Sequence, residues 1–322
     1  LSLLVGAAFL GAFTPAVQAE DSAYRASVNA SSMREALGGQ SVPLLKTVPF
    51  KGGRQKQLEQ LRKIMGSGLA RRLHLQNPGK VRSSDRSLLL PAADGSWYLE
   101  VMGDGSVFRY RGGIDDPKEV DAAARFGRLD MATLERLGHE FIAKQLAPLA
   151  PLADGERLVF LGTRYLREGS ASEEDQKFTS DVVANLAVFG REVQGTYVAG
   201  PGSKIAVWFS NVGEPVGFDV DWPTYQVTRT AQKTLALGQV WKRLFAYANS
   251  PQDLIEKNLS HFECGYVDLG GRKRGTAMLQ AGCFALHDGL LGDDLKYASL
   301  EVIPIGQKVV SDKMWPVTQA IV

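Results

Sequence analysis

The stretch FGREVQGTYVAGPGSKIAVWFSNVGEPVGFDVDW, residues 189–222, decides the fold that we expect for this chain. Apolar and polar residues alternate along it, which is the period of a β-strand with one buried face. Gly195, Gly200 and Gly213 interrupt the alternation at the spacing of hairpin turns. The stretch therefore predicts a series of antiparallel strands joined by short turns.

The segments before this stretch predict another hairpin and two helices. Two runs of strand-forming residues flank Gly103 to Gly105 in SWYLEVMGDGSVFRYRGG, which is the composition of a tight turn. Asp130 is a suitable N-cap for a helix that continues to Ala147, where Pro148 follows. Further upstream, apolar residues at helical spacing predict a helix over residues 54–65.

From these elements we expect an α+β fold in which helices pack on curled antiparallel sheets. The expected divisions are a signal peptide at residues 1–19, an N-terminal lead-in with a basic helix at 20–90, an α+β domain at 91–228, and a helix with a disulfide-bonded β-hairpin at 229–322. The last unit begins with a helix predicted over residues 232–249. It is similar in plan to the unit before it, so the chain holds two similar units or one continuous domain.

The opening stretch also resembles the strand portion of the PepSY-like and fungalysin/thermolysin-propeptide families. The positions that carry the resemblance are turn glycines and strand residues, namely Phe189, Gly195, Val198, Gly200, residues 205–209, Gly213 and Val216. The resemblance implies a helix packed on a curled antiparallel sheet, in a module that restrains a peptidase or assists its folding. No H-E-x-x-H motif follows in this chain, so such a module would act on a separate protein.

The first nineteen residues predict a secretory signal peptide. An apolar run, LSLLVGAAFLGAF, is followed by a helix-breaking proline and by small residues at Val17 and Ala19. The basic segment that usually begins a signal peptide is missing. We expect cleavage after Ala19, a secreted or periplasmic protein, and no transmembrane segment in the mature chain.

The nearly balanced global charge argues against a strongly cationic protein, such as one that binds nucleic acid. The chain has 37 Lys and Arg residues against 35 Asp and Glu residues, so its global charge predicts no nucleic-acid footprint and no strong attraction to an anionic membrane. The helix expected at 54–65 lies in a locally basic segment. Such a helix can contact lipid or a partner, although a solvated helix face is the commoner explanation.

The two cysteines, Cys264 and Cys283, predict a disulfide bond. An exported protein leaves the reducing cytoplasm, and an even number of cysteines favours pairing over a catalytic thiol. A turn centred on Lys273 and Arg274 would place the two cysteines directly opposite each other in a hairpin. Arg272 would lie beside them at the tip, where the three basic side chains are a possible binding site for an acidic partner or are only solvated.

No catalytic or metal-binding motif is recognisable, so we expect no enzyme, no metal and no cofactor. The four histidines are scattered, and none lies near a nucleophile motif. Asp219 and Asp221 share one face of a predicted strand beside Trp222, a combination that occurs on carbohydrate-contacting surfaces. A polar strand end is the simpler interpretation of these three residues.

Two functions of different class remain open. The first is an exported, non-enzymatic module that binds a protein or peptide in the cell envelope or outside the cell. The second is a hydrolase of an envelope polymer, with Asp219 and Asp221, or His261 and His287, in the active role.

Overall fold

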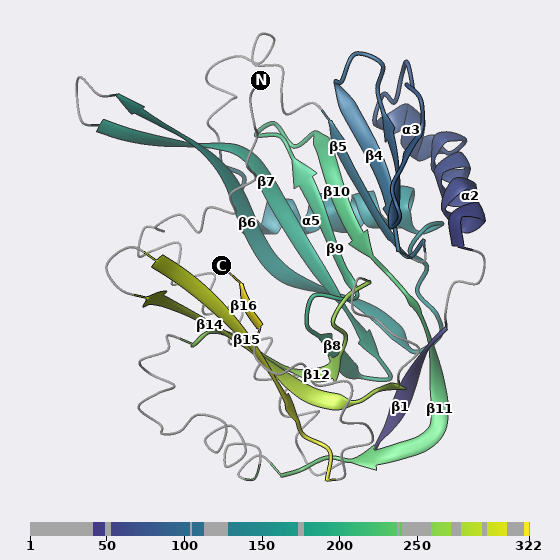
Figure 1. Ribbon diagram of the computed structural model, residues 1–322, viewed down its shortest axis with the longest axis vertical. Coiled ribbons are helices and arrows are strands. Elements are labelled where there is room, and N and C mark those ends of the chain that lie inside the picture. Colours follow the sequence, from purple (N-terminus) through teal and green to yellow (C-terminus); the bar gives the residue numbers. More distant parts are fainter. Residues whose placement is uncertain are drawn as a thin grey trace.

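The computed structural model shows sixteen strands, three α-helices and one π-helical turn in the described part of the chain (Figure 1). The described residues are 41–48, 53–103, 105–112, 128–172, 177–236, 239, 259–271, 278–291, 295–307 and 319–321. None of the helices in these ranges has the length and apolar composition that a membrane span needs.

One antiparallel run of strands forms the centre of the molecule. In spatial order it contains β2 (Arg82–Ser83), β3 (Ser87–Pro91), β4 (Trp97–Met102), β5 (Val107–Gly112), β10 (Pro215–Asp221), β9 (Lys204–Phe209), β7 (Lys177–Val193) and β6 (Glu156–Ser172). Buried and half-buried residues alternate strictly along β4, β5 and β9, as the sequence pattern requires for a sheet with one covered face. The hairpins predicted around residues 103–105 and within 189–222 are confirmed.

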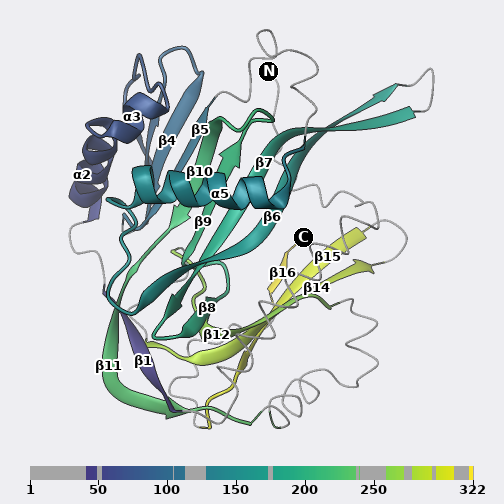
Figure 2. The same cartoon turned by 180° about the vertical axis from the view of Figure 1, so that it is seen from behind.

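The helices pack on one face of these strands (Figure 2). They are α2 (Gly53–Met65), α3 (Gly68–Arg72) and α5 (Met131–Phe141), which continues as the π-helical turn η1 (Ile142–Leu146). Asp130 caps α5 as predicted, because its side chain accepts a hydrogen bond from the Thr133 backbone amide at 2.9 Å. Gly138 allows α5 to approach β7 closely, since a Cβ atom there would lie 2.5 Å from Cε2 of Phe189.

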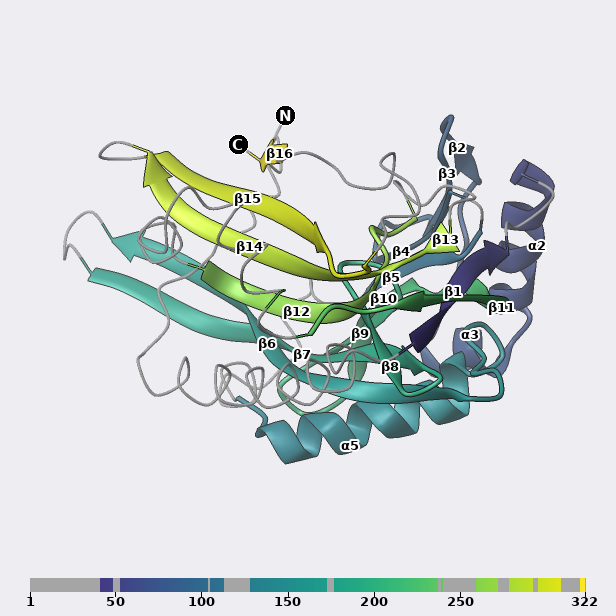
Figure 3. The same cartoon turned by 90° about the horizontal axis from the view of Figure 1, so that it is seen from below.

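A second group of strands lies on the side of the central strands that faces away from α5 (Figure 3). β8 (Thr196–Ala199) pairs with the end of β7 and, in parallel, with β12 (Leu259–Val267). From there the sheet continues through β14 (Ala281–Leu291), β15 (Leu295–Pro304) and β16 (Gln319–Ile321). A separate three-stranded sheet joins β11 (Thr224–Lys233), β1 (Ser41–Val48) and β13 (Met278–Leu279).

The expected α+β class, with helices packed on curled sheets, is wrong, because the described chain is mainly β. The error comes partly from the helix predicted over residues 232–249. Gln232 instead lies in β11, opposite Val42 of β1, and its buried side chain accepts a hydrogen bond from the Ala281 amide at 3.2 Å. Pairing with a strand almost 190 residues away overrides the helical spacing. The helix prediction is thus wrong for residues 232–236, whereas Gln239 is helical and residues 237, 238 and 240–249 lie outside the described residues.

Candidate binding face

The central strands carry a face that no described helix covers, turned toward the reader in Figure 1. Neighbouring strands place Tyr98, Arg111, Gly217 and Trp208 opposite one another in a row that crosses β4, β5, β10 and β9. The side chains of Tyr98, Arg111 and Trp208 are half-buried. The next row along the same strands contains Glu100, Arg109, Asp219 and Ala206. We call these eight residues the open face.

Asp219 is held at the centre of the open face by three donors. Its two carboxylate oxygens accept hydrogen bonds from Nε of Arg109 at 2.6 Å and from Nη2 of Arg111 at 2.5 Å. The indole Nε1 of Trp208 donates to the same carboxylate at 3.2 Å. Burial alone would raise the pKa of Asp219, but the two guanidinium groups outweigh it and hold that pKa below its usual value. The carboxylate is therefore ionised at neutral pH and is unsuited to act as a general acid.

Gly217 makes room for a guanidinium group to lie on an indole ring. It stands between Arg111 and Trp208 in the row, and the Arg111 guanidinium carbon lies 4.4 Å from the centroid of the Trp208 ring. A Cβ atom at position 217 would lie 3.3 Å from Cδ of Arg111 and 3.5 Å from Cβ of Trp208. This contact was missed at the level of sequence, although a glycine inside a strand is the usual signal of a close approach.

The two arginines of the open face differ in how many of their N–H donors already form hydrogen bonds within the protein. Arg111 also donates through Nη1 to the carbonyl oxygens of Tyr110 and Phe218, at 2.8 and 3.1 Å. Within the described residues, the hydrogen bond of Arg109 is made by Nε to Asp219. Its terminal nitrogens make no further hydrogen bond among the described residues, and its side chain is 39% exposed.

Asp221 and Trp222 do not belong to the open face. Asp221 accepts a hydrogen bond from the Gly271 amide at 2.8 Å and so fastens the loop that follows β12. Trp222 is buried in the helix-covered core, where its indole nitrogen donates to the carbonyl of Pro151 at 3.0 Å. Of the three predicted neighbours, Trp222 is buried, Asp221 is half-buried and bonded to the loop after β12, and only Asp219 belongs to the open face.

A buried polar network joins the two groups of strands. Arg191 of β7 donates to Oγ of Ser203 at 2.8 Å, and Ser203 and Tyr225 share a hydrogen bond of 2.6 Å between their hydroxyls. The Tyr225 hydroxyl in turn donates to Asp268, in the loop after β12. The chain of bonds runs from a cation to an anion, and all four residues are buried. Because a substrate cannot reach Ser203, we interpret the network as a structural joint.

The loop at residues 200–204 is fixed by a second set of buried contacts. Glu263 accepts hydrogen bonds from the Gly200 amide and from the Tyr197 hydroxyl, the latter at 3.1 Å. Burial, together with the nearby Glu263 charge, raises the pKa of Tyr197 well above its usual value. Lys204 donates to the carbonyl oxygens of Val198 and Gly202 at 2.8 and 3.2 Å, and burial lowers its pKa. The sequence predicted only a turn here, with no partner for it.

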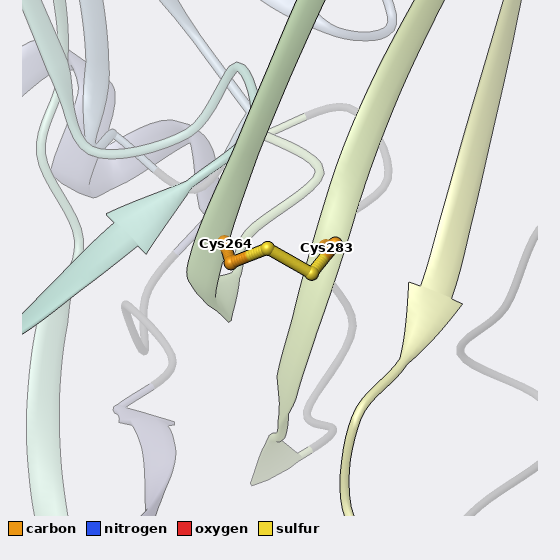
Figure 4. The surroundings of a disulfide bond; sticks show 2 residues. All are labelled: Cys264 and Cys283. Atoms are coloured by element: carbon orange, nitrogen blue, oxygen red, sulfur yellow. A yellow bond between two sulfur atoms is a disulfide. The ribbon is translucent and has the colours of Figure 1, made fainter. Parts of the chain in front are cut away.

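The predicted disulfide bond is confirmed (Figure 4). Cys264 of β12 and Cys283 of β14 are directly opposite in the antiparallel register, with sulfurs 2.03 Å apart and both side chains buried. The proposed basic tip, Arg272 to Arg274, lies outside the described residues. His261 and His287 occupy β12 and β14, opposite Leu286 and Leu259. No group of three metal-ligating side chains occurs in the described ranges.

Comparisons with known proteins leave the family open. No family model matches the chain, and no curated protein matches it, so the resemblance to PepSY-like modules stays a prediction. Among solved structures, the chain is similar to an uncharacterized protein from Eubacterium rectale ATCC 33656. The two share 12% identical residues with a TM-score of 0.45, over 84% of this chain and 86% of that chain. No function follows from this similarity.

Proposed function

We propose that this chain is an exported, non-enzymatic module that binds a protein or peptide through the open face. The single observation that carries the proposal is the set of aromatic and guanidinium side chains gathered on that face. Trp, Tyr and Arg are the residue types that contribute most to binding at protein interfaces. Here Trp208, Tyr98 and Arg109 present these groups on rigid strands, and Asp219 orients the arginines in advance.

The disulfide supports the exported location in this proposal, because such bonds persist in oxidising compartments outside the cytoplasm. The role implied by the PepSY resemblance, restraint or folding assistance of a separate peptidase, is one form of the same function. The alternative of an envelope-polymer hydrolase would need another residue as its general acid, since Asp219 is ionised and bound to two arginines.

The test is a selection of displayed random peptides on the oxidised protein, followed by fluorescence anisotropy with the selected peptides. Trp208→Ala and Arg109→Gln each remove one group of the open face. Arg136→Gln is the matched control, because Arg136 is an exposed arginine of α5 on the helix-covered side. We expect the open-face variants to weaken binding by roughly 30-fold, the effect of losing an interface hot spot, and the control to bind like the parent protein.

Two results would contradict the proposal. One is that no peptide is enriched above a background of unrelated immobilised protein. The other is that selected peptides bind the open-face variants as tightly as they bind the parent protein. The near-ultraviolet circular dichroism of each variant must match that of the parent, so that a loss of binding is not a loss of fold.

A further inference from the structure

Basic and acidic residues are unevenly distributed along the chain, although their totals nearly balance. Residues 53–86, which comprise α2, α3, β2 and their connections, hold nine of the 37 Lys and Arg residues but only two of the 35 Asp and Glu residues. This segment therefore carries a net charge of +7, whereas the other 28 basic and 33 acidic residues give the rest of the chain −5. We call residues 53–86 the basic end.

Most of the cations of the basic end face solvent and form no salt bridge among the described residues. Two of them pair with acids, Lys56 with Glu59 at 2.8 Å and Arg72 with Glu214 at 3.2 Å, and both pairs are exposed. Other exposed cations of this segment make no salt bridge and no side-chain hydrogen bond within the described residues. These are Arg62, Arg71, Lys80, Arg82 and Arg86.

The helices α2 and α3 of the basic end lie beyond β4, on the opposite side of the molecule from the far end of the β6–β7 hairpin (Figure 1). Arg54 at the start of α2 donates to the carbonyl of Ser84 at 3.4 Å, which holds the helix against the β2–β3 turn. On α2, Leu61 and Ile64 are buried, so Arg62 and Lys63 point outward. The helix keeps its apolar stripe inside the protein and presents charge to the outside.

We propose that the basic end docks electrostatically on an anionic lipid bilayer. Exposed cations concentrated at one end of a protein attract acidic headgroups, and their effects add as each charge approaches the membrane. An exposed apolar side chain supports a lipid bilayer as the partner, because it can enter the membrane interface. Val81 is 47% accessible and lies between Lys80 and Arg82. The proposal does not depend on the function proposed for the open face.

The composition of the basic end favours lipid over the other polyanions. Residues 53–86 contain no Phe, Tyr or Trp. Single-stranded nucleic acids are bound largely by stacking on aromatic side chains, and protein interfaces depend on aromatic anchors at their centres. Electrostatic docking on a bilayer surface requires no aromatic side chains. A hollow of about 480 Å³ between Arg54, Gln57 and residues 83–85 is open and polar.

The test is cosedimentation of the full, oxidised chain with two kinds of vesicle, phosphatidylcholine alone and equal parts of phosphatidylcholine and phosphatidylglycerol. The test variant combines Arg62→Gln, Arg71→Gln and Arg82→Gln. The control variant removes the same charge elsewhere, by Lys46→Gln, Arg136→Gln and Arg229→Gln at exposed positions. Residues 1–19 are present in all three proteins, so any contribution they make to binding is the same.

We expect the parent and the control to bind the anionic vesicles, and to release them in high salt. The test variant should bind on the order of a hundredfold more weakly, at about fivefold for each lost charge. The proposal is overturned if the parent does not prefer anionic vesicles, or if the control loses as much affinity as the test variant. Polyglutamate and heparin are tested in parallel, and tighter binding to either than to vesicles would also overturn it.

Discussion

The buried ion pair of Arg191 and Glu156 should be strongly coupled, and a double-mutant cycle measures this directly. Their side chains are 1% and 4% exposed, with Nη1 of Arg191 3.2 Å from the Glu156 carboxylate. Arg191 also donates to Ser203 and, at 2.6 Å, to the carbonyl of Pro223. Arg191→Met leaves the Glu156 charge buried without its cation, which typically costs about 3–5 kcal/mol. That is a large share of the roughly 5–15 kcal/mol by which a native domain is stable.

The second variant of the cycle, Glu156→Gln, removes the negative charge and keeps a side chain of nearly the same shape. Glu156→Gln keeps an oxygen that can accept from the Ala153 amide, a bond of 3.0 Å in the parent protein, so we expect a smaller loss of about 1–3 kcal/mol. In the double variant no uncompensated charge remains. Its loss should therefore fall short of the sum of the single losses by about 2 kcal/mol. Urea unfolding, followed by circular dichroism and by tryptophan fluorescence, gives the four free energies.

A matched exposed pair is the control. Arg136 and Glu140 of α5 form a salt bridge of 3.0 Å with side chains 60% and 45% exposed. The same substitutions there should show a coupling of about 0.5 kcal/mol or less. The reasoning is refuted if the costs at Arg191 and Glu156 are additive, or if Arg191→Met costs no more than Arg136→Met.

Three further substitutions test other parts of the structure, each by denaturant unfolding. Replacing Cys264 and Cys283 by serine should lower the free energy of unfolding by about 2–4 kcal/mol, because the unfolded chain regains the freedom of the closed loop; an unchanged midpoint would contradict this. Asp219→Asn should cost about 1 kcal/mol at neutral pH, since half-exposed ion pairs contribute modestly. As the folded pKa of Asp219 is lowered, that contribution is present above its ordinary value of 3.8 and is lost as the pH falls through the folded value, so a difference that persists in strong acid would be inconsistent. Gly138→Ala should destabilise by about 1–3 kcal/mol through overlap with Phe189, and a stabilised variant would show that helix propensity outweighs packing.

Local features of this fold were predictable from sequence, because local chemistry determines them. The turn glycines Gly195, Gly200 and Gly213 have positive φ values of 75, 91 and 84°, the conformation that makes glycine the preferred residue. The cap at Asp130 depends on a residue three positions away. The disulfide bond was predicted from the expected export of the chain and from the spacing of the two cysteines. In each case the partners lie within about twenty residues of one another.

Long-range pairing was not predictable by the same means. Residues 41–48 were expected only as part of an N-terminal lead-in, and nothing in them specifies β11 and β13 as neighbours of β1. The joint of Arg191, Ser203, Tyr225 and Asp268 likewise needs residues from four separate segments to meet. Alternation also shows which residues share a face without showing which face the helices cover. The open face was therefore recognised at Asp219 alone, without Arg109, Arg111 or Trp208.

We expect that occupation of one of the two proposed surfaces leaves the other accessible. The basic end lies beyond β4, whereas Trp208 lies on β9 in the middle of the sheet, with β5 and β10 between β9 and β4 (Figure 1). Well-separated sites without shared contacts contribute additively to free energy. The peptides selected on the open face should thus bind the Arg62, Arg71 and Arg82 triple variant with the affinity of the parent protein, and anionic vesicles should leave that affinity unchanged. A change of more than about threefold in either measurement would show that the two surfaces act as one site.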